Sequence, residues 1–116
     1  MSSVNTPSQE EIESFLQQAR KAIADENYSY YPRKKFLDLC AKLGRILDDD
    51  EIFDIINNLD HTNYFRGPTP DHDLTKTDVV WEFKSSLDNI SLYIKVKIIE
   101  LDDEKLHCFG FHEDEV

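Results

Sequence analysis

The segment Leu92-Tyr93-Ile94-Lys95-Val96-Lys97-Ile98 alternates apolar and polar side chains without interruption. Successive side chains of a β-strand point to opposite faces, so this alternation predicts a strand with one aliphatic face and one polar face. The aliphatic face needs a covering layer, because a small sheet on its own is only marginally stable. The segment therefore predicts a sheet that packs on one side against other elements.

Two further strands are predicted on either side of this segment. The stretch Val79-Val80-Trp81-Glu82-Phe83 is rich in β-branched and aromatic residues, and a turn follows it at 87–90. Residues 101–104 turn the chain back, and 106–111 form the last predicted strand. Because both connections are short, we expect an antiparallel meander of about three strands.

The first half of the chain has helical spacing instead. Ser8 and Glu11 form a capping box before apolar residues at helical intervals, which predicts a helix over about 8–25. A second helix is expected over about 32–44, because it has a proline in its first turn and a glycine at its end. A third begins at the acidic run 48–51, where negative side chains favour a helix N-terminus.

Residues 60–77 are predicted to form a polar loop, which is long for a compact domain and for that reason a candidate for function. The expected fold class is α+β, with three N-terminal helices packed on a small antiparallel sheet of about three strands. At 116 residues the chain fits one domain. We expect a flexible tail over 1–7 and a single domain over 8–116.

The composition limits the classes of function. A formal net charge of −11 argues against binding of nucleic acid by the whole surface, although it leaves room for a local basic site or a basic partner. No apolar run approaches the roughly 20 residues of a membrane span, and the N-terminus lacks the features of a signal peptide. Cys40 and Cys108 lie far apart in apolar patterns, which indicates reduced core thiols in a cytoplasmic protein.

Side chains suited to chemistry gather near the expected polar face of the sheet. A titratable imidazole, a carboxylate, a phenol and several cations are the groups needed to cleave RNA without a metal, because one proton leaves the attacking 2′-hydroxyl and another reaches the leaving 5′-oxygen. Cations must also stabilise the charge that builds on the phosphoryl oxygens. Taken alone, an exposed face of this kind is more often simply solvated. The candidates are Arg66, Trp81, Glu82, Tyr93, Lys95, Lys97 and His112.

Other charged or titratable groups are weaker candidates. Arg33-Lys34-Lys35 opens the second helix against its dipole, which is consistent with a solvated surface or with contact to RNA or a protein. Asp71-His72-Asp73 could suggest a metal site, but we expect a solvated loop there. His61 and His107 have no evident partner and are expected on the surface. No metal ligand set and no cofactor are predicted.

Several segments together resemble the MqsR-type toxins of toxin–antitoxin systems, which are mRNA interferases with a RelE-like fold. The segment 63–73, Asn-Tyr-Phe-Arg-Gly-Pro-Thr-Pro-Asp-His-Asp, is similar to the family's D-Y-Y-K-G-P-E-P-D-x-D segment. The resemblance continues through 80–83, 92–97 and Phe111-His112-Glu113, and the upstream Tyr31-Pro32-Arg33-Lys34-Lys35 resembles the family's P-R-R-K-N helix. It covers about residues 12–114.

The resemblance implies a RelE-like toxin domain and specific roles for the candidate residues. The family's catalytic positions fall on Arg66, Glu82, Tyr93 and His112. Arg66 and Lys95 would hold the scissile phosphate, Tyr93 would position or stack on the substrate, and His112 and Glu82 would share acid and base work. Lys95, Lys97 and Trp81 are the expected substrate contacts.

The leading hypothesis is therefore a metal-independent endoribonuclease toxin that cuts mRNA by attack of a 2′-hydroxyl on the adjacent phosphate. Its expected partners are mRNA and a cognate antitoxin, with no membrane and no DNA bound by the chain alone. The alternative is a non-catalytic, acidic protein-interaction module of the same fold. An antitoxin or DNA-mimic role is weaker, because it leaves the clustered Arg66, Tyr93, Lys95 and His112 without a purpose.

Overall fold

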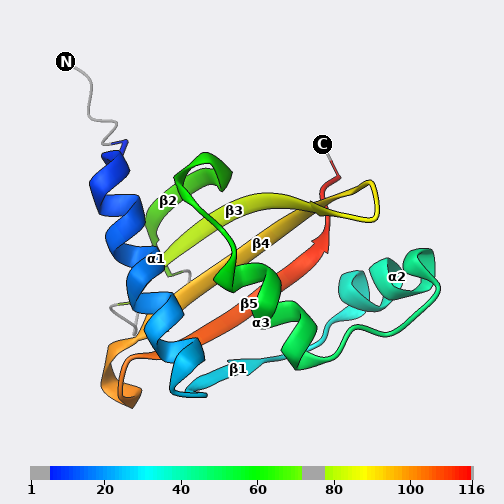
Figure 1. Ribbon diagram of the computed structural model, residues 1–116, viewed down its shortest axis with the longest axis horizontal. Coiled ribbons are helices and arrows are strands. Elements are labelled where there is room, and N and C mark those ends of the chain that lie inside the picture. Colours follow the sequence, from blue (N-terminus) through cyan, green and yellow to red (C-terminus); the bar gives the residue numbers. More distant parts are fainter. Residues whose placement is uncertain (1–5, 72–77, 116) are drawn as a thin grey trace.

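Five strands form one mixed sheet within residues 6–71 and 78–115, which are the residues that this computed structural model describes (Figure 1). Three α-helices and two short 3-10 helices accompany the sheet over the same ranges. In chain order the elements are α1 Gln9–Ala24, β1 Tyr28–Tyr30, α2 Lys34–Leu43, α3 Asp49–Asn57, η1 His61–Asn63, β2 Tyr64–Pro70, β3 Val79–Leu87, β4 Ile90–Ile99, η2 Glu100–Asp102 and β5 Lys105–Glu113.

The strands lie in the order β1-β5-β4-β3-β2. Strand β1 is parallel to β5, and all other neighbouring pairs are antiparallel. The predicted antiparallel sheet of about three strands is therefore wrong. Strands β3, β4 and β5 form the expected meander, but one strand is added at each edge of it.

Strand β2 arises from the segment that was predicted to be a polar loop. It contains Gly67, Pro68 and Pro70, and prolines are tolerated in a sheet mainly on edge strands, because they cannot donate to the ladder. Its pairing with β3 is irregular, with shifts of register on both sides of Arg66. Gly67 has a φ of +115°, and a Cβ there would come within 2.5 Å of the Val80 carbonyl oxygen, so only glycine fits.

Strand β1 is only three residues long and pairs in parallel with the start of β5. The sequence Tyr28-Ser29-Tyr30 carries no long alternating pattern and lies between the helices predicted over about 8–25 and 32–44, so no strand was predicted there. Its position is set by tertiary contacts: Tyr28 stacks on Phe53 of α3 with ring centroids 4.1 Å apart, and Tyr30 meets Phe36 of α2 edge-on at 5.1 Å. Contacts of this kind override weak local propensity.

The helices begin and end close to where the sequence predicts. Helix α1 carries the expected capping box, in which Ser8 accepts from the Glu11 amide and Glu11 accepts from the Ser8 amide. Helix α2 ends at Gly44, which has a left-handed φ of +79°. The Asp48 side chain caps α3 by accepting from the Glu51 amide at 2.9 Å.

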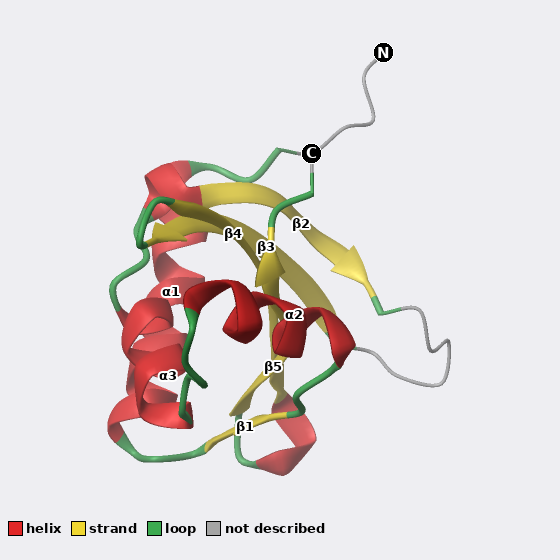
Figure 2. Ribbon diagram, turned by 90° about the vertical axis from the view of Figure 1, so that its right-hand side faces the viewer, coloured by secondary structure: helices red, strands yellow, loops and turns green. Residues whose placement is uncertain are grey.

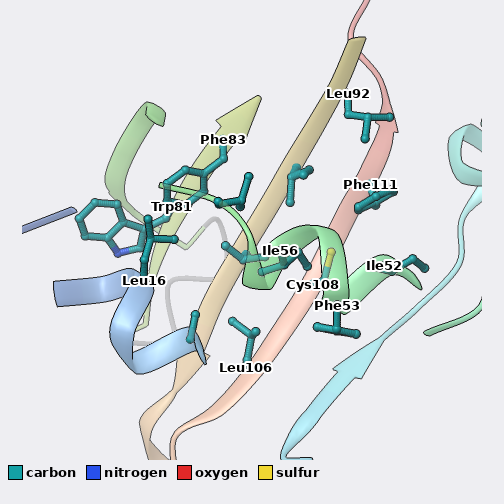
Figure 3. Close-up of a cluster of buried hydrophobic side chains, with 14 of the residues drawn as sticks. Leu16, Ile52, Phe53, Ile56, Trp81, Phe83, Leu92, Leu106, Cys108 and Phe111 are labelled. Carbon is teal, nitrogen blue, oxygen red and sulfur yellow. The ribbon is translucent and has the colours of Figure 1, made fainter. Parts of the chain in front are cut away.

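Helices α1 and α3 cover one face of the sheet, and α2 lies beside the β1–β5 edge (Figures 1 and 2). The core lies between these helices and the sheet (Figure 3). The aliphatic side chains of β4 are buried there, as predicted, together with Trp81 and Phe83 of β3. The buried residues of β4 are Leu92, Ile94, Val96 and Ile98.

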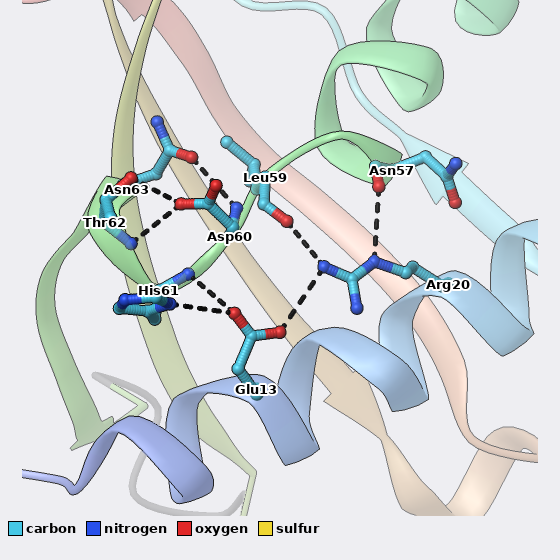
Figure 4. A network of polar contacts seen from close by, with 8 residues as sticks. All are labelled: Glu13, Arg20, Asn57, Leu59, Asp60, His61, Thr62 and Asn63. Atoms are coloured by element: carbon cyan, nitrogen blue, oxygen red, sulfur yellow. Dashed lines mark hydrogen bonds and ion pairs between the residues drawn. The ribbon is translucent and has the colours of Figure 1, made fainter.

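A polar network ties α1 to the segment that joins α3 to β2 (Figure 4). Glu13 accepts from the backbone amide of His61 at 2.9 Å and lies 3.2 Å from its Nδ1, and this contact lowers the pKa of the Glu13 carboxyl. Arg20 donates to the carbonyl oxygens of Asn57 and Leu59. His61, expected on the surface without a partner, is therefore half-buried and engaged.

Both cysteines are unpaired and buried, as the apolar patterns predict. Burial raises the pKa of the Cys108 thiol to about 12. None of the described helices is long and apolar enough to cross a membrane. The weak metal candidate Asp71-His72-Asp73 extends beyond the described residues at His72 and Asp73.

Candidate active site

The sheet face opposite α1 and α3 brings most of the predicted site residues together. The register places Tyr93 of β4 directly beside His112 of β5. In the neighbouring cross-strand row, Glu82 of β3 lies beside Lys95 of β4, which in turn lies beside Gly110 of β5. Because side chains two residues apart on a strand share a face, these rows form one polar surface.

His112 is held by its own strand and by Tyr93. The two rings stack with centroids 5.2 Å apart and planes inclined by 19°. Nδ1 of His112 lies 2.8 Å from the carbonyl oxygen of Glu113. A carbonyl oxygen can only accept, so Nδ1 carries the hydrogen and Nε2 of the neutral ring keeps its lone pair. The imidazole is thereby set up to act as a base through Nε2.

A cleft of about 550 Å³ opens between the start of α2 and strands β4 and β5. It brings the basic segment Arg33-Lys34-Lys35 to the same space as Tyr93, Lys95 and His112. None of the described residues that line it is Asp or Glu, in a chain with 24 acidic residues. The cleft is therefore a local basic site on an acidic protein.

Two cations in this cleft are available to a ligand. Lys34 pairs with Asp38 at 3.1 Å, and Lys35 pairs with Glu115 at 2.9 Å. Arg33 and Lys95, by contrast, have no ion-pair partner within the described part of the chain. An incoming anion would meet these two side chains first.

Arg66 and Glu82 form a fork-to-fork ion pair at the edge of this surface. Nε and Nη2 of Arg66 donate to the two carboxylate oxygens of Glu82 at 3.1 and 3.0 Å. Glu82 is only 4% exposed, and its hydrogen bonds with Arg66, together with its charge, raise the pKa of the Arg66 guanidinium. A carboxylate held on both oxygens is poorly placed to take a proton from a substrate, so the predicted acid–base role of Glu82 is not supported. It orients Arg66 instead.

Lys97 does not reach the cleft. Its side chain is 8% exposed, and its Nζ lies 2.6 Å from Asp71 and 3.5 Å from Asp78. The two carboxylates flank the segment 72–77. Lys97 therefore neutralises two partly buried acids, and the geometry does not support its predicted contact with substrate.

Trp81 lies on the opposite face of the sheet from the other candidates. Its ring stacks on Phe15 of α1 with centroids 4.7 Å apart, and it is 7% exposed. The prediction that it contacts substrate is not supported, because its neighbours along β3 alternate between the two faces and it points to the core (Figure 3).

Several residues that line the cleft were not selected from the sequence. Tyr31, Phe109 and Gly110 line it together with Lys95. Gly110 leaves room there, since a Cβ at this position would lie 2.9 Å from the Lys95 Cβ. The signal for Tyr31 was its position beside the basic segment, whereas the exposure of Phe109 depends on a register shift in β5 that sequence alternation does not reveal.

Comparisons with known proteins add no family assignment. No known family model matches the chain, and no curated protein is detectably similar to it. Within the described ranges, no group of three or more His, Cys, Asp or Glu side chains is placed to hold a metal ion.

Proposed function

We propose that this protein is an endoribonuclease that cleaves RNA through attack of a 2′-hydroxyl on the adjacent phosphate. The observation that carries the proposal is the placement of His112, whose Nδ1 donates to a carbonyl oxygen and leaves Nε2 as the acceptor, in a cleft whose lining includes Lys95 and Arg33. An imidazole base next to cations is the arrangement that this reaction needs. The resemblance of several segments to MqsR-type toxins points to the same chemistry.

In the proposed reaction, Nε2 of His112 takes the proton of the 2′-hydroxyl as its oxygen forms a bond to phosphorus. The bond from phosphorus to the 5′-oxygen breaks, and that oxygen leaves as a hydroxyl after taking a proton from solvent. The products are a 2′,3′-cyclic phosphate and a 5′-hydroxyl end. No electron acceptor and no water are consumed in this step.

The neighbouring side chains have distinct parts in this scheme. Lys95 stabilises the charge on the phosphoryl oxygens, and Arg66, oriented by Glu82, does the same from the adjoining hollow of about 320 Å³ that it shares with Lys95. Tyr93 holds the imidazole plane by stacking. The edge of Phe65 meets Tyr93 in turn, with ring centroids 6.1 Å apart.

We propose further that the cellular substrate is mRNA and that the protein is the toxin of a toxin–antitoxin pair in the cytoplasm. The cognate antitoxin would block cleavage by covering the cleft. Unpaired, buried thiols are compatible with a reducing compartment.

Replacing His112 tests the proposal. We expect His112→Ala to lower the rate of RNA cleavage by about 10²–10⁴-fold, which is the usual contribution of a general acid–base residue. Cleavage of a labelled single-stranded RNA is followed on gels in the presence of EDTA, and the 2′,3′-cyclic phosphate is identified by mass spectrometry. Equal circular dichroism spectra for both proteins exclude unfolding.

The competing function is a non-catalytic module that binds a basic protein. The net charge of −11 and the neutralised Lys97 and Arg66 favour it. Induced expression without an antitoxin separates the two functions: growth arrest that is lost in His112→Ala supports the nuclease. A folded His112→Ala protein that cuts as fast as wild type, or wild-type cleavage abolished by EDTA, contradicts the His112 mechanism, whereas a folded wild-type protein that cuts no RNA and arrests no growth favours the module.

A further inference from the structure

The cleft extends beyond the residues that the proposed reaction uses. Tyr93, Lys95 and His112 occupy its β4–β5 wall, whereas Tyr31 and Arg33 stand across from them before α2. Tyr31 is 64% exposed, an unusual degree for an aromatic ring. Arg33 has no ion-pair partner among the described residues, unlike the neighbouring Lys34 and Lys35. An exposed ring and a free guanidinium side by side are available to a ligand.

Tyr31 belongs to a row of rings at this end of the cleft. Tyr31 and His107 form an edge-to-face contact with centroids 5.2 Å apart, and His107 is stacked on Phe109 at 5.9 Å with planes inclined by 7°. Phe109 also lies within 5.7 Å of Lys95 Nζ. The contact with His107 holds the Tyr31 ring on one side, while Tyr31 stays 64% exposed.

A flexible strand of bases and phosphates fits this combination better than a duplex does. Aromatic rings that alternate with cations bind single strands, because unpaired bases can stack on the rings while the backbone follows the charges. In a duplex the bases are already stacked on one another, and A-form RNA offers proteins mainly its backbone and shallow groove.

We infer that the cleft holds single-stranded RNA, with Arg33 on the phosphate next to the scissile one and Tyr31 stacked on an adjacent base. The inference rests on the proposed function, because the position of the RNA along the cleft is fixed by placing its scissile bond at His112. Arg33 and Tyr31 then act in binding, while His112 acts in the chemical step.

A probe that cannot be cut separates binding from cleavage. A short fluorescent oligoribonucleotide with 2′-O-methyl groups at every position has no 2′-hydroxyl to attack phosphorus. We expect Arg33→Ala to weaken its binding and to reduce the slope of log K against log salt by about 0.7, the value for one phosphate contact on a single strand. Arg45→Ala is the matched control, because Arg45 pairs with Glu51 outside the cleft.

The stacking contact has its own pair of variants. Tyr31→Ala should weaken binding about tenfold, within the range measured for one base stacked on one ring. Tyr31→Phe keeps the ring and should bind as wild type does. On a cleavable RNA, Arg33→Ala and Tyr31→Ala should raise KM with little change in kcat, in contrast to His112→Ala.

The outcomes distinguish this inference from the proposed function. Probe binding that depends on Arg33 and Tyr31, without any cleavage of ordinary RNA, supports the binding cleft and overturns the nuclease. If Arg33→Ala and Tyr31→Ala both leave RNA cleavage unchanged, the inference about the cleft is overturned and the proposed nuclease function stands. Failure of the probe to bind wild type, or equal binding of a duplex of the same sequence, also overturns the inference.

Discussion

At the scale of single residues, the polar face of the sheet separates cations that are already paired from cations that are not. Arg66 meets the buried carboxylate of Glu82 and Lys97 meets the largely buried carboxylates of Asp71 and Asp78, whereas Lys95 lies one cross-strand row from His112 and has no ion-pair partner among the described residues. A paired cation attracts an anion less strongly than an unpaired one, because its field is partly compensated at short range. Arg66 is 58% exposed and keeps N–H groups that Glu82 does not use, so it can still assist Lys95. The availability of a side chain, and not its residue type, therefore decides its role.

The Arg66–Glu82 pair provides the first prediction at this scale. Arg66→Ala should cost about 1–3 kcal/mol in the free energy of unfolding, because it leaves a buried carboxylate without its donor. In the double variant with Glu82→Gln the loss should be smaller than the sum of the single losses, with a coupling of about 0.5–3 kcal/mol. Urea denaturation of the four proteins measures both quantities.

The same variants test whether Glu82 transfers protons. If Glu82 only orients Arg66, Glu82→Gln should lower cleavage modestly, and adding it to Arg66→Ala should lower cleavage no further. A loss with Glu82→Gln as large as that with His112→Ala would restore Glu82 as an acid–base group.

Gly110 allows a prediction about packing beneath the cleft. A Cβ there would lie 2.9 Å from the Lys95 Cβ, and this atom is close to the backbone and cannot swing away. Gly110→Ala should therefore cost about 1–3 kcal/mol in the free energy of unfolding, as overpacking usually does. It should also displace Lys95 and reduce cleavage. Unchanged urea denaturation and activity would show that β4 and β5 can separate at this point without cost.

At the scale of elements, the helices and strands that have a long periodic pattern were predicted from the sequence, and the two edge strands were not. Strand β4 and helix α1 carry their own periodicity and caps. Strand β2 is interrupted by glycine and prolines, and β1 is too short to show a period. Strand β1 also depends on a partner, β5, that is distant in sequence, and the spacing of residues within a short segment cannot reveal such a partner.

The same distinction holds for the candidate site: the face on which a side chain lies was predicted from the sequence, and its partners from other elements were not. Alternation along β4 correctly placed Tyr93 and Lys95 on one face, and it also placed Lys97 there. It could not show that Asp71 and Asp78 would neutralise Lys97, because these residues come from outside β4, one just after β2 and the other just before β3. The same rule, applied to β3, would have separated Trp81 from Glu82.

The pairing of β1 with β5 leads to a prediction of pH dependence. His107 faces Ser29 across this pair, with its Nδ1 2.8 Å from the serine hydroxyl. Burial lowers the pKa of His107, and the positive charges of Lys97, Arg33 and Lys105 lower it further. In the unfolded state the imidazole has a pKa of about 6.5. As the pH falls, His107 therefore binds a proton in the unfolded protein before it does so in the folded protein.

The sign of the effect follows from proton linkage. The contribution of His107 to stability is complete above about pH 6.5 and is lost as the pH falls through the lower pKa of the folded state. His107→Gln should therefore narrow the difference between the urea midpoints at pH 7 and pH 5. An equal difference in both proteins would mean that His107 titrates alike in the folded and unfolded states.

At the scale of the whole molecule, an acidic chain must approach a polyanion if the proposed function holds. The molecule measures 45 × 34 × 27 Å and carries a formal net charge of −11. At about 0.01 M salt the screening length is about 30 Å, comparable to these dimensions, so RNA meets the repulsion of the entire protein. At about 0.1 M the length is about 10 Å, and only the charges around the basic cleft act on a strand near it.

This decrease in the screening length with salt predicts an unusual salt dependence of RNA association. The association rate of single-stranded RNA should rise between about 0.01 and 0.1 M salt, as the overall repulsion is screened, and fall above that as the attraction to the cleft is screened in turn. A basic nuclease would show only the fall. Stopped-flow fluorescence with the 2′-O-methylated probe measures the rate.

Neutralising distant acids tests whether net charge is the cause. Asp102 and Asp103 are exposed in the turn before β5 and do not line the cleft. Asp103 has a left-handed φ of +54°, which asparagine tolerates well. The double variant Asp102→Asn, Asp103→Asn should speed association at about 0.01 M salt, flatten the initial rise, and leave the rate at high salt unchanged. If the wild-type association rate falls from the lowest salt concentration onward, the attraction of the cleft exceeds the repulsion by the net charge at every salt concentration. The acidity of the chain then has another purpose.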